Sequence, residues 1–236
     1  MPSLKNWDNQ TWLSSKKYIQ SFNNFVLKQL KLNKNSKILD IGCGRGKIIE
    51  NLSNKLKLIN KPVGLDIENH KDKSKKIIFR KIDGLSFISK TKATFDLILI
   101  KQTIHLIKEN KIKKLLSICK SKLNNKGAII ILSIDPKINE IPSFTLMNNK
   151  LKKSLKRDKK IFDLIYKIYP KLITKYFIFN VKILKNEYLQ MIKKRFISTL
   201  LNFNDDQIIE GLKEINKKYK KEIKFKDRLV CLIIKK

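Results

Sequence analysis

The feature that most constrains this chain is a glycine-rich turn between a short apolar run and a helix-forming segment. Residues 38–41 read Ile-Leu-Asp-Ile, the next five read Gly-Cys-Gly-Arg-Gly, and a helical pattern begins at Lys47. Three of the seven glycines in the chain fall within those five positions. Glycine has no Cβ atom, so it permits a sharp turn and a close approach of the main chain to a ligand. The pattern predicts a buried strand, a ligand-binding turn and a helix N-terminus with free amides.

The same alternation of short apolar runs and helical patterns continues along the chain. Near-continuous apolar strands between helices are typical of a parallel sheet covered on both faces. The pattern predicts strands over 37–41, 62–67, 77–82, 95–100, 127–134, 176–184 and 227–235. It predicts helices over 6–31, 47–58, 108–123, 187–201 and 205–219.

We interpret residues 1–236 as one α/β domain with two helical additions. The first is a cap over residues 1–33, where apolar residues recur at near-helical spacing. The second is a basic, mostly helical insertion that begins at Pro136 and interrupts the alternation until about residue 176. We expect this insertion to act as a lid.

Two common nucleotide-binding signatures do not fit the glycine turn. A dinucleotide fingerprint of the form GxGxxG or GxGxxA requires Gly or Ala at position 47, which is Lys47 here. The phosphate-binding pattern GxxxxGK[ST] does not occur anywhere in the chain. The GxGxG spacing therefore disfavours a dehydrogenase and a P-loop enzyme.

The charge of the chain is strongly positive, but its composition weakens the obvious interpretation. Lys and Arg number 54 against 20 Asp and Glu, a net charge of +34, with 42% hydrophobic residues, which is enough for a folded core. Only five of the basic residues are Arg, although Arg reads phosphates and bases better than Lys. A genome-wide bias toward AT-rich codons would produce this lysine excess. We therefore expect only non-specific binding to nucleic acids.

The cysteines, histidines and apolar runs indicate a cytoplasmic protein without a metal site. Cys43, Cys119 and Cys231 are an odd number without CxxC spacing, as expected for reduced thiols. The two histidines, His70 and His105, form no cluster with metal-ligand spacing. No apolar run is long enough to span a membrane, and residues 1–10 lack the pattern of a secretory signal.

Two aspartates follow the next predicted strands at their carboxyl ends. Asp66 ends the second strand, where a carboxylate can accept hydrogen bonds from ribose hydroxyls, and Asp83 follows the third, where it can accept from an adenine amino group. A single aspartate at a strand end is more often a turn former or a helix cap. The two together, downstream of the glycine turn, favour a nucleoside site.

With these motifs the chain resembles the class I S-adenosylmethionine-dependent methyltransferases. The first motif is residues 38–46, and the later motifs are Val63-Gly64-Leu65-Asp66-Ile67, Ile82-Asp83-Gly84, the apolar run 95–100, and Lys126-Gly127-Ala128. The resemblance covers residues 37 to about 135, and the last two predicted strands would complete the seven-stranded, mostly parallel Rossmann-like sheet of the family. Arg45 departs from the small residue often found at its position.

The resemblance implies a site for S-adenosylmethionine, with S-adenosylhomocysteine as product. The glycines of the turn would pass under the methionine part, Asp66 would bind ribose, and Asp83 with Gly84 would hold adenine. The cofactor residues that we expect are Asp40, Gly42, Cys43, Gly44, Gly46, Asp66, Ile67, Asp83, Gly84, Lys101 and Gln102.

The segment after the fourth strand indicates which acceptors are disfavoured. It reads Lys101-Gln102-Thr103-Ile104-His105, without the Asn or Asp, Pro, Pro, aromatic run of related amino methyltransferases of adenine and cytosine. No Pro-Cys pair occurs, so a cytosine C5 enzyme is also disfavoured. His105 occupies a position where small-molecule members often carry His or an aromatic residue. We expect it either to act as a base or to pack in the following helix.

Further residues are candidates for binding the acceptor. Trp12 and Tyr18 would belong to a lid formed by the N-terminal helix, unless they are core residues. Arg195 and Ser198 lie in a segment resembling one found before the last strand of some small-molecule relatives. Since the chain so strongly prefers Lys, Arg195 indicates a need for a bidentate fork, which either an acidic substrate or an internal salt bridge would satisfy.

Three functions are compatible with these observations. The leading hypothesis is a methyltransferase acting on a small metabolite, an acidic one if Arg195 binds it. An RNA or protein methyltransferase would use the basic segment 150–160 to hold its polymer, and a catalytically inert protein would bind the cofactor without turnover. The sequence does not predict the methyl acceptor, the atom methylated or the oligomeric state.

Overall fold

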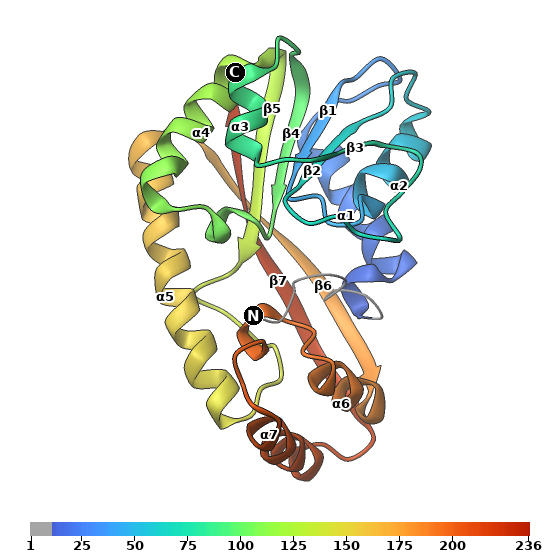
Figure 1. The fold of residues 1–236 in the computed structure, drawn as a ribbon, viewed down its shortest axis with the longest axis vertical. Coiled ribbons are helices and arrows are strands. Elements are labelled where there is room, and N and C mark those ends of the chain that lie inside the picture. Colours follow the sequence, from blue (N-terminus) through green and yellow to red (C-terminus); the bar gives the residue numbers. More distant parts are fainter. Residues whose placement is uncertain (1–10) are drawn as a thin grey trace.

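The computed structural model describes residues 11–236, which form a seven-stranded sheet with helices on both faces (Figure 1). The strand order is β3-β2-β1-β4-β5-β7-β6. Strands β1 to β5 are parallel, whereas β7 runs antiparallel to both β5 and β6. The strands are β1 (Ile38–Ile41), β2 (Val63–Asp66), β3 (Ile78–Lys81), β4 (Phe95–Lys101), β5 (Leu123–Ile134), β6 (Ile173–Leu184) and β7 (Glu222–Lys235). All seven predicted strands are confirmed, as is the fold class.

The alternating side chains of the central strands build two separate cores. On β4, Leu97 and Leu99 face the core under α1 (Lys16–Gln29) and α2 (Lys47–Leu56). Ile98 and Ile100 face the opposite core, under α3 (Gly84–Lys90), α4 (Glu109–Ser121) and the second half of α5 (Thr145–Ile168). Because both faces of the sheet are covered, its central strands are apolar throughout.

The strands β6 and β7 extend beyond the rest of the sheet and carry a second layer of helices (Figure 1). There α6 (Lys185–Lys193) and α7 (Asp205–Lys218) pack against the hairpin and the first half of α5. The two halves of α5 therefore pack against different parts of the protein. Its Met147 belongs to the core that includes Ile208 and Ile215 of α7, whereas Ile161 and Ile165 pack in the opposite core of the sheet.

Two predicted helices are shorter or interrupted. The helix predicted over 6–31 is a 3-10 turn, η1 (Trp12–Ser14), followed by α1, which starts where the Ser15 hydroxyl accepts a hydrogen bond from the Tyr18 amide. Residues 6–10 lie outside the described residues. The helix predicted over 187–201 ends at Lys193, and a separate 3-10 turn, η3, spans Ser198–Leu200.

The break after α6 has a local cause at Arg195. This residue adopts a left-handed backbone with φ of +52°, and its amide donates to the Ile192 carbonyl. The Phe196 amide donates to the Met191 carbonyl, which completes a Schellman motif at the end of the helix. The basic segment is mostly helical as predicted, and α5 connects β5 to β6.

Candidate functional site

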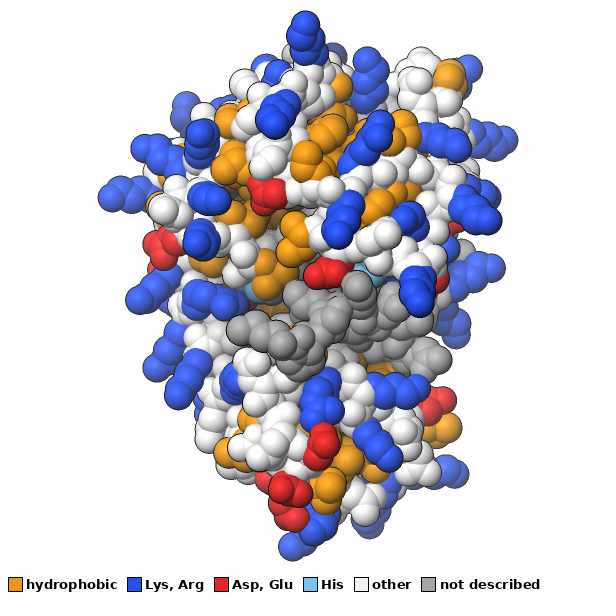
Figure 2. Space-filling model, viewed as in Figure 1, with side chains coloured by type: hydrophobic (Ala, Val, Ile, Leu, Met, Phe, Trp, Pro, Cys, Tyr) orange, Lys and Arg blue, Asp and Glu red, His pale blue; other side chains and the backbone are white. Residues whose placement is uncertain are grey.

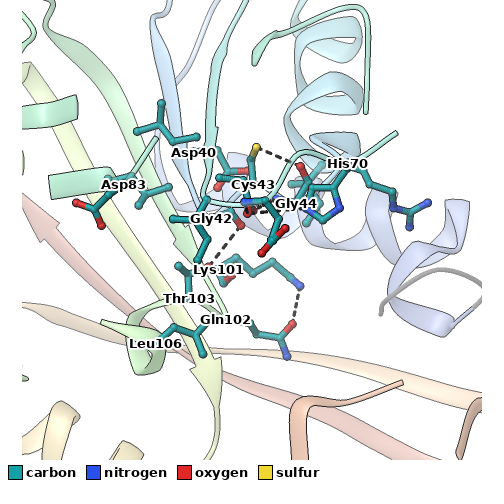
Figure 3. A pocket seen from close by; sticks show the side chains of 18 of the residues that line it. Asp40, Gly42, Cys43, Gly44, His70, Asp83, Lys101, Gln102, Thr103 and Leu106 are labelled. Carbon is teal, nitrogen blue, oxygen red and sulfur yellow. Dashed lines mark hydrogen bonds and ion pairs between the residues drawn. The ribbon is translucent and has the colours of Figure 1, made fainter. Parts of the chain in front are cut away.

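A cavity of about 300 Å³ lies at the carboxyl ends of the first parallel strands. Ten of the eleven residues expected to hold the cofactor line it, and Figure 3 shows the glycine turn, Asp83 and Lys101 around it. The exception is Gly46, the residue before α2, where an added Cβ would lie 2.2 Å from Ile77 Cδ1. Gly46 therefore serves the packing of the turn.

The glycine turn has the backbone that its sequence predicts. Gly42, Gly44 and Gly46 have φ of +76°, +54° and +72°, a region in which only glycine is free of strain. A Cβ on Gly42 would lie 2.1 Å from Thr103 Oγ1, because the turn packs closely on the segment after β4. A Cβ on Gly44 would meet no atom within 4 Å, since this residue faces the cavity. The turn thus leaves space for a ligand against its main chain.

Asp66 ties the end of β2 to this turn. One carboxylate oxygen accepts the Gly44 amide at 2.8 Å, and the other accepts the Glu68 amide at 2.9 Å. The imidazole Nε2 of His70 lies 3.8 Å from the second oxygen. The carboxylate lines the cavity while these contacts fix its orientation. It is therefore held in place to accept hydrogen bonds from hydroxyls.

Asp83 is both a helix-capping residue and part of the cavity wall. Its carboxylate caps α3 by accepting from the Ser86 amide at 3.0 Å, and it also lines the cavity. Nearby, Ile67 and Leu106 line the same cavity with 60% and 54% of their surfaces exposed. Exposed apolar side chains next to a polar group suit a flat heterocycle with an exocyclic donor.

A buried carboxylate lies beneath the cavity at the end of β1. Asp40 is 3% exposed, and its Oδ1 has no hydrogen-bond partner among the described residues. Burial raises the pKa of Asp40 to about 7, the charge of Asp66 adds to this, and the Lys101 ammonium opposes it. The Lys101 Nζ also donates to Gln102 Oε1 at 3.0 Å and lies over the rings of Tyr18 and Phe22.

A second cavity of about 80 Å³ adjoins the first. Leu13, Gln102 and Leu106 line both cavities, so the two spaces are neighbours that share these walls. The aromatic rings of Trp12 and Phe196 lie 5.2 Å apart and enclose part of the second cavity. We call these two spaces the turn cavity and the inner cavity.

The inner cavity brings together three of the predicted acceptor-site residues. Trp12, Ser198 and His105 all line it, although they come from η1, η3 and η2 (Ile104–Leu106). The Nδ1 of His105 is buried and has no hydrogen-bond partner among residues 11–236. Burial lowers the pKa of His105, Asp158 opposes this shift, and Arg157 adds to it.

Two predicted acceptor-site residues line neither cavity. Tyr18 is fully buried among Phe22, Phe177 and Phe179, so it is a core residue. The Arg195 guanidinium donates to Asp205 Oδ1 at 2.7 Å and to the Phe203 carbonyl at 3.2 Å. The internal salt bridge, one of the two expectations for Arg195, is thus the one observed. Arg195 therefore gives no support to an acidic substrate.

Two buried carboxylates of the inner cavity were not predicted from the sequence. Asp158 is 5% exposed and falls on the apolar stripe of α5 in a stretch that otherwise looks like a charged surface. Asp227 is 2% exposed, alternates with the buried Phe225 and Leu229 on β7, and accepts the indole N–H of Trp12 at 2.9 Å. An acidic residue at an apolar position of each pattern was the available signal.

Comparison with known proteins identifies the family. A family model described as a methyltransferase domain matches residues 15–161, which is more than half of the chain. No relative among the curated proteins matches the sequence.

Among solved structures, the plantazolicin methyltransferase BpumL, in complex with a monoazolic desmethylPZN analog and SAH, is 17% identical with a TM-score of 0.54. That alignment covers 98% of this chain and 87% of BpumL. A protein of Anabaena variabilis that is assigned as a methyltransferase of an antibiotic biosynthesis pathway is 16% identical with a TM-score of 0.58, covering 89% and 95% of the two chains. These likenesses bear on the fold.

The sheet order, the glycine turn and the family match define the class: this is an enzyme with the class I methyltransferase fold. The chain belongs to the methyltransferase domain family, and the resemblance to S-adenosylmethionine-dependent methyltransferases is confirmed. Among residues 11–236 no helix is long and apolar enough to cross a membrane.

Proposed function

We propose that the protein transfers a methyl group from S-adenosylmethionine to a small molecule that enters the inner cavity. One observation carries this proposal: the turn cavity, with its glycine turn and two carboxylates, lies next to a partly aromatic cavity and shares Leu13, Gln102 and Leu106 with it. The solved neighbour BpumL is a methyltransferase in complex with SAH, which supports the same cofactor here. The cytoplasmic location expected from the three thiols remains part of the proposal.

The residues of the turn cavity fit this cofactor. Gly44 offers an open main chain at the place where a side chain would fill the cavity, and the unpartnered oxygen of Asp40 lies below the turn. Asp66 would accept from the ribose hydroxyls, and Asp83 would accept from the adenine amino group. Ile67 would contact the adenine ring. Bound there, the cofactor supplies an electrophilic methyl group attached to a positively charged sulfur.

The protein contributes positioning and a proton acceptor. An acceptor in the inner cavity must align its lone pair with the methyl group, and holding two reactants in such a geometry can supply most of the acceleration. Trp12 and Phe196 would exclude water from one side. His105, neutral in its buried position, would accept the proton that the acceptor releases.

The test is calorimetric titration with S-adenosylhomocysteine. We expect the unmodified protein to bind with a Kd on the micromolar scale, and Asp66→Ala to weaken binding by roughly 1.5 to 3 kcal/mol because charge-assisted hydrogen bonds are lost. Asp206→Ala is the matched control, since Asp206 is exposed on α7. Absence of binding by the unmodified protein would refute the proposal.

A polymeric acceptor receives less support. This alternative requires the lysines of segment 150–160 to lie together beside the opening of the cofactor site. Most of them are exposed on α5, but none lines either cavity. In addition, Figure 2 shows Lys and Arg over the whole visible face, without a concentration at one place. The inner cavity of about 80 Å³ also favours a compact acceptor group.

A further inference from the structure

Acidic residues are enriched at the two cavities relative to the whole chain, since they equal the basic residues in number there. Six of its 20 acidic residues line the two cavities: Asp40, Asp66, Glu68, Asp83, Asp158 and Asp227. Four carboxylates are buried among residues 11–236, and three of these are at the cavities. In the whole chain, by contrast, the 54 basic residues far outnumber the acidic ones. Burying a carboxylate is also costly, because a buried charge requires a partner.

The inner cavity in particular has carboxylates on two opposite elements. Asp158 belongs to α5 and Asp227 to β7, and both are at least 95% buried. Asp227 accepts the Trp12 indole, and Asp158 accepts the Nε and Nη2 of its neighbour Arg157 at 3.4 and 3.2 Å. The Arg157 side chain also lines this cavity and is 53% exposed, so part of it is in contact with solvent.

We infer that the inner cavity, with Asp158, Asp227 and His105 on its walls, takes an amine as the methyl acceptor. This inference rests on the proposed function and adds the substrate class. An amine arrives as an ammonium ion, which the buried carboxylates attract, whereas they repel a carboxylate or phenolate. Asp158 is the anchor, because the half-exposed Arg157 side chain can turn into the solvent and leave this carboxylate to the amine.

The changes of charge during methyl transfer to an amine are compatible with a cavity that has carboxylates on its walls. The ammonium ion releases a proton, to His105 or to water, and so frees the nitrogen lone pair; the carboxylates favour the ammonium form, so this deprotonation is uphill. The nitrogen–carbon bond then forms as the carbon–sulfur bond breaks, and the electron pair of that bond moves to sulfur. Positive charge passes from sulfur to the methylated nitrogen, so the product is again an ammonium ion within reach of the carboxylates. Relative to the neutral amine, the fixed carboxylate charges stabilise the positive charge that develops on nitrogen.

The experiment compares acceptors of equal shape and different charge. Protein saturated with S-adenosylhomocysteine is titrated calorimetrically with n-butylamine, 1-butanol and butanoate, and the same compounds are incubated with S-adenosylmethionine and analysed by mass spectrometry. We expect the amine to bind at least tenfold more tightly than the other two and to be the compound that gains a methyl group. Equal binding of all three, or preferred methylation of butanol or butanoate, would overturn the inference.

Three variants locate the effect at Asp158. Asp158→Asn should weaken amine binding at least tenfold and leave the affinity for S-adenosylhomocysteine unchanged. Arg157→Gln should strengthen amine binding severalfold, because it removes the cation that competes for Asp158. The matched control is Asp163→Asn, on the same helix but 60% exposed and paired with Lys159. If Asp158→Asn fails to fold, Arg157→Gln decides: unchanged or weaker amine binding would overturn the inference.

The two proposals fail in different ways. If the unmodified protein does not bind S-adenosylhomocysteine, the proposed function is wrong. If it binds that compound but shows no preference for the amine, only the substrate class is wrong.

Discussion

At the scale of single residues, substituting Ala for Gly44 or for Gly42 should have different effects, although both glycines belong to the same turn. Gly44→Ala places its Cβ in the turn cavity, so we expect S-adenosylhomocysteine affinity to fall at least about tenfold, with a stability loss of about 1–2 kcal/mol from the left-handed backbone. Gly42→Ala drives its Cβ into Thr103, so about 1–3 kcal/mol of overpacking adds to the same strain. Calorimetry and chemical denaturation on both variants distinguish the effects. Equal stability losses would contradict this account.

The raised pKa of Asp40 predicts how the free energy of unfolding depends on pH. Its pKa is raised from 3.8 to about 7 in the folded protein, chiefly by burial, so the folded state holds a proton that the unfolded state releases. This contribution is fully present below pH 4 and is lost as the pH rises through 7. At about 1.36 kcal/mol per pH unit, it amounts to at most about 4 kcal/mol.

Asp40→Asn should remove that part of the pH dependence. Between pH 4 and 7, the unfolding free energy of the unmodified ligand-free protein should fall more steeply than that of the variant. Urea denaturation at several pH values measures both slopes. Asp227 also has a pKa raised by burial and contributes in the same direction in both proteins. Identical slopes would show that Asp40 does not bind the proton.

At the scale of elements, Arg195 joins the end of α6 to the start of α7. Its backbone closes the Schellman motif, and its guanidinium reaches Asp205 and the Phe203 carbonyl. Because Asp205 is 87% exposed, the ion pair is worth only about 0–1 kcal/mol. Arg195→Lys should lower the Tm slightly and leave cofactor affinity and turnover unchanged. A substantial rise in the KM for the acceptor would instead show that Arg195 binds the acceptor.

The elements themselves were predictable where local physics decides them. Period and composition located all seven strands, and the three glycines located the turn, because only glycine tolerates its backbone. The end of α6 was not predictable, since Arg195 occupies a left-handed position at which glycine is the usual residue. The short helix α3 was also missed, although Asp83, its capping residue, was identified for another role.

At the scale of the whole molecule, the inner cavity depends on contacts between distant segments. Trp12 donates to Asp227 across 215 residues, and His105 meets Asp158 only because α5 returns past η2. Sequence patterns located the turn cavity, whose residues follow consecutive strands. For the inner cavity they identified Trp12, His105 and Ser198 but not Asp158 and Asp227, because its walls belong to elements whose mutual placement is set by tertiary packing. The same packing explains why Arg195 and Ser198, three positions apart, face different surroundings.

The net charge of +34 is also a property of the whole molecule, and it predicts weak binding to RNA. Because Lys and Arg are spread over the visible surface (Figure 2), this binding should have no sequence preference and should largely disappear between low and physiological salt, as counterion release requires. Replacing Lys152, Lys153 and Lys156 on α5 by Gln should weaken it no more than replacing Lys217, Lys220 and Lys221, which are equally exposed. Fluorescence anisotropy with labelled RNA across a salt series measures each protein. Selective binding that survives physiological salt and depends on the α5 lysines alone would instead favour a methyltransferase acting on RNA.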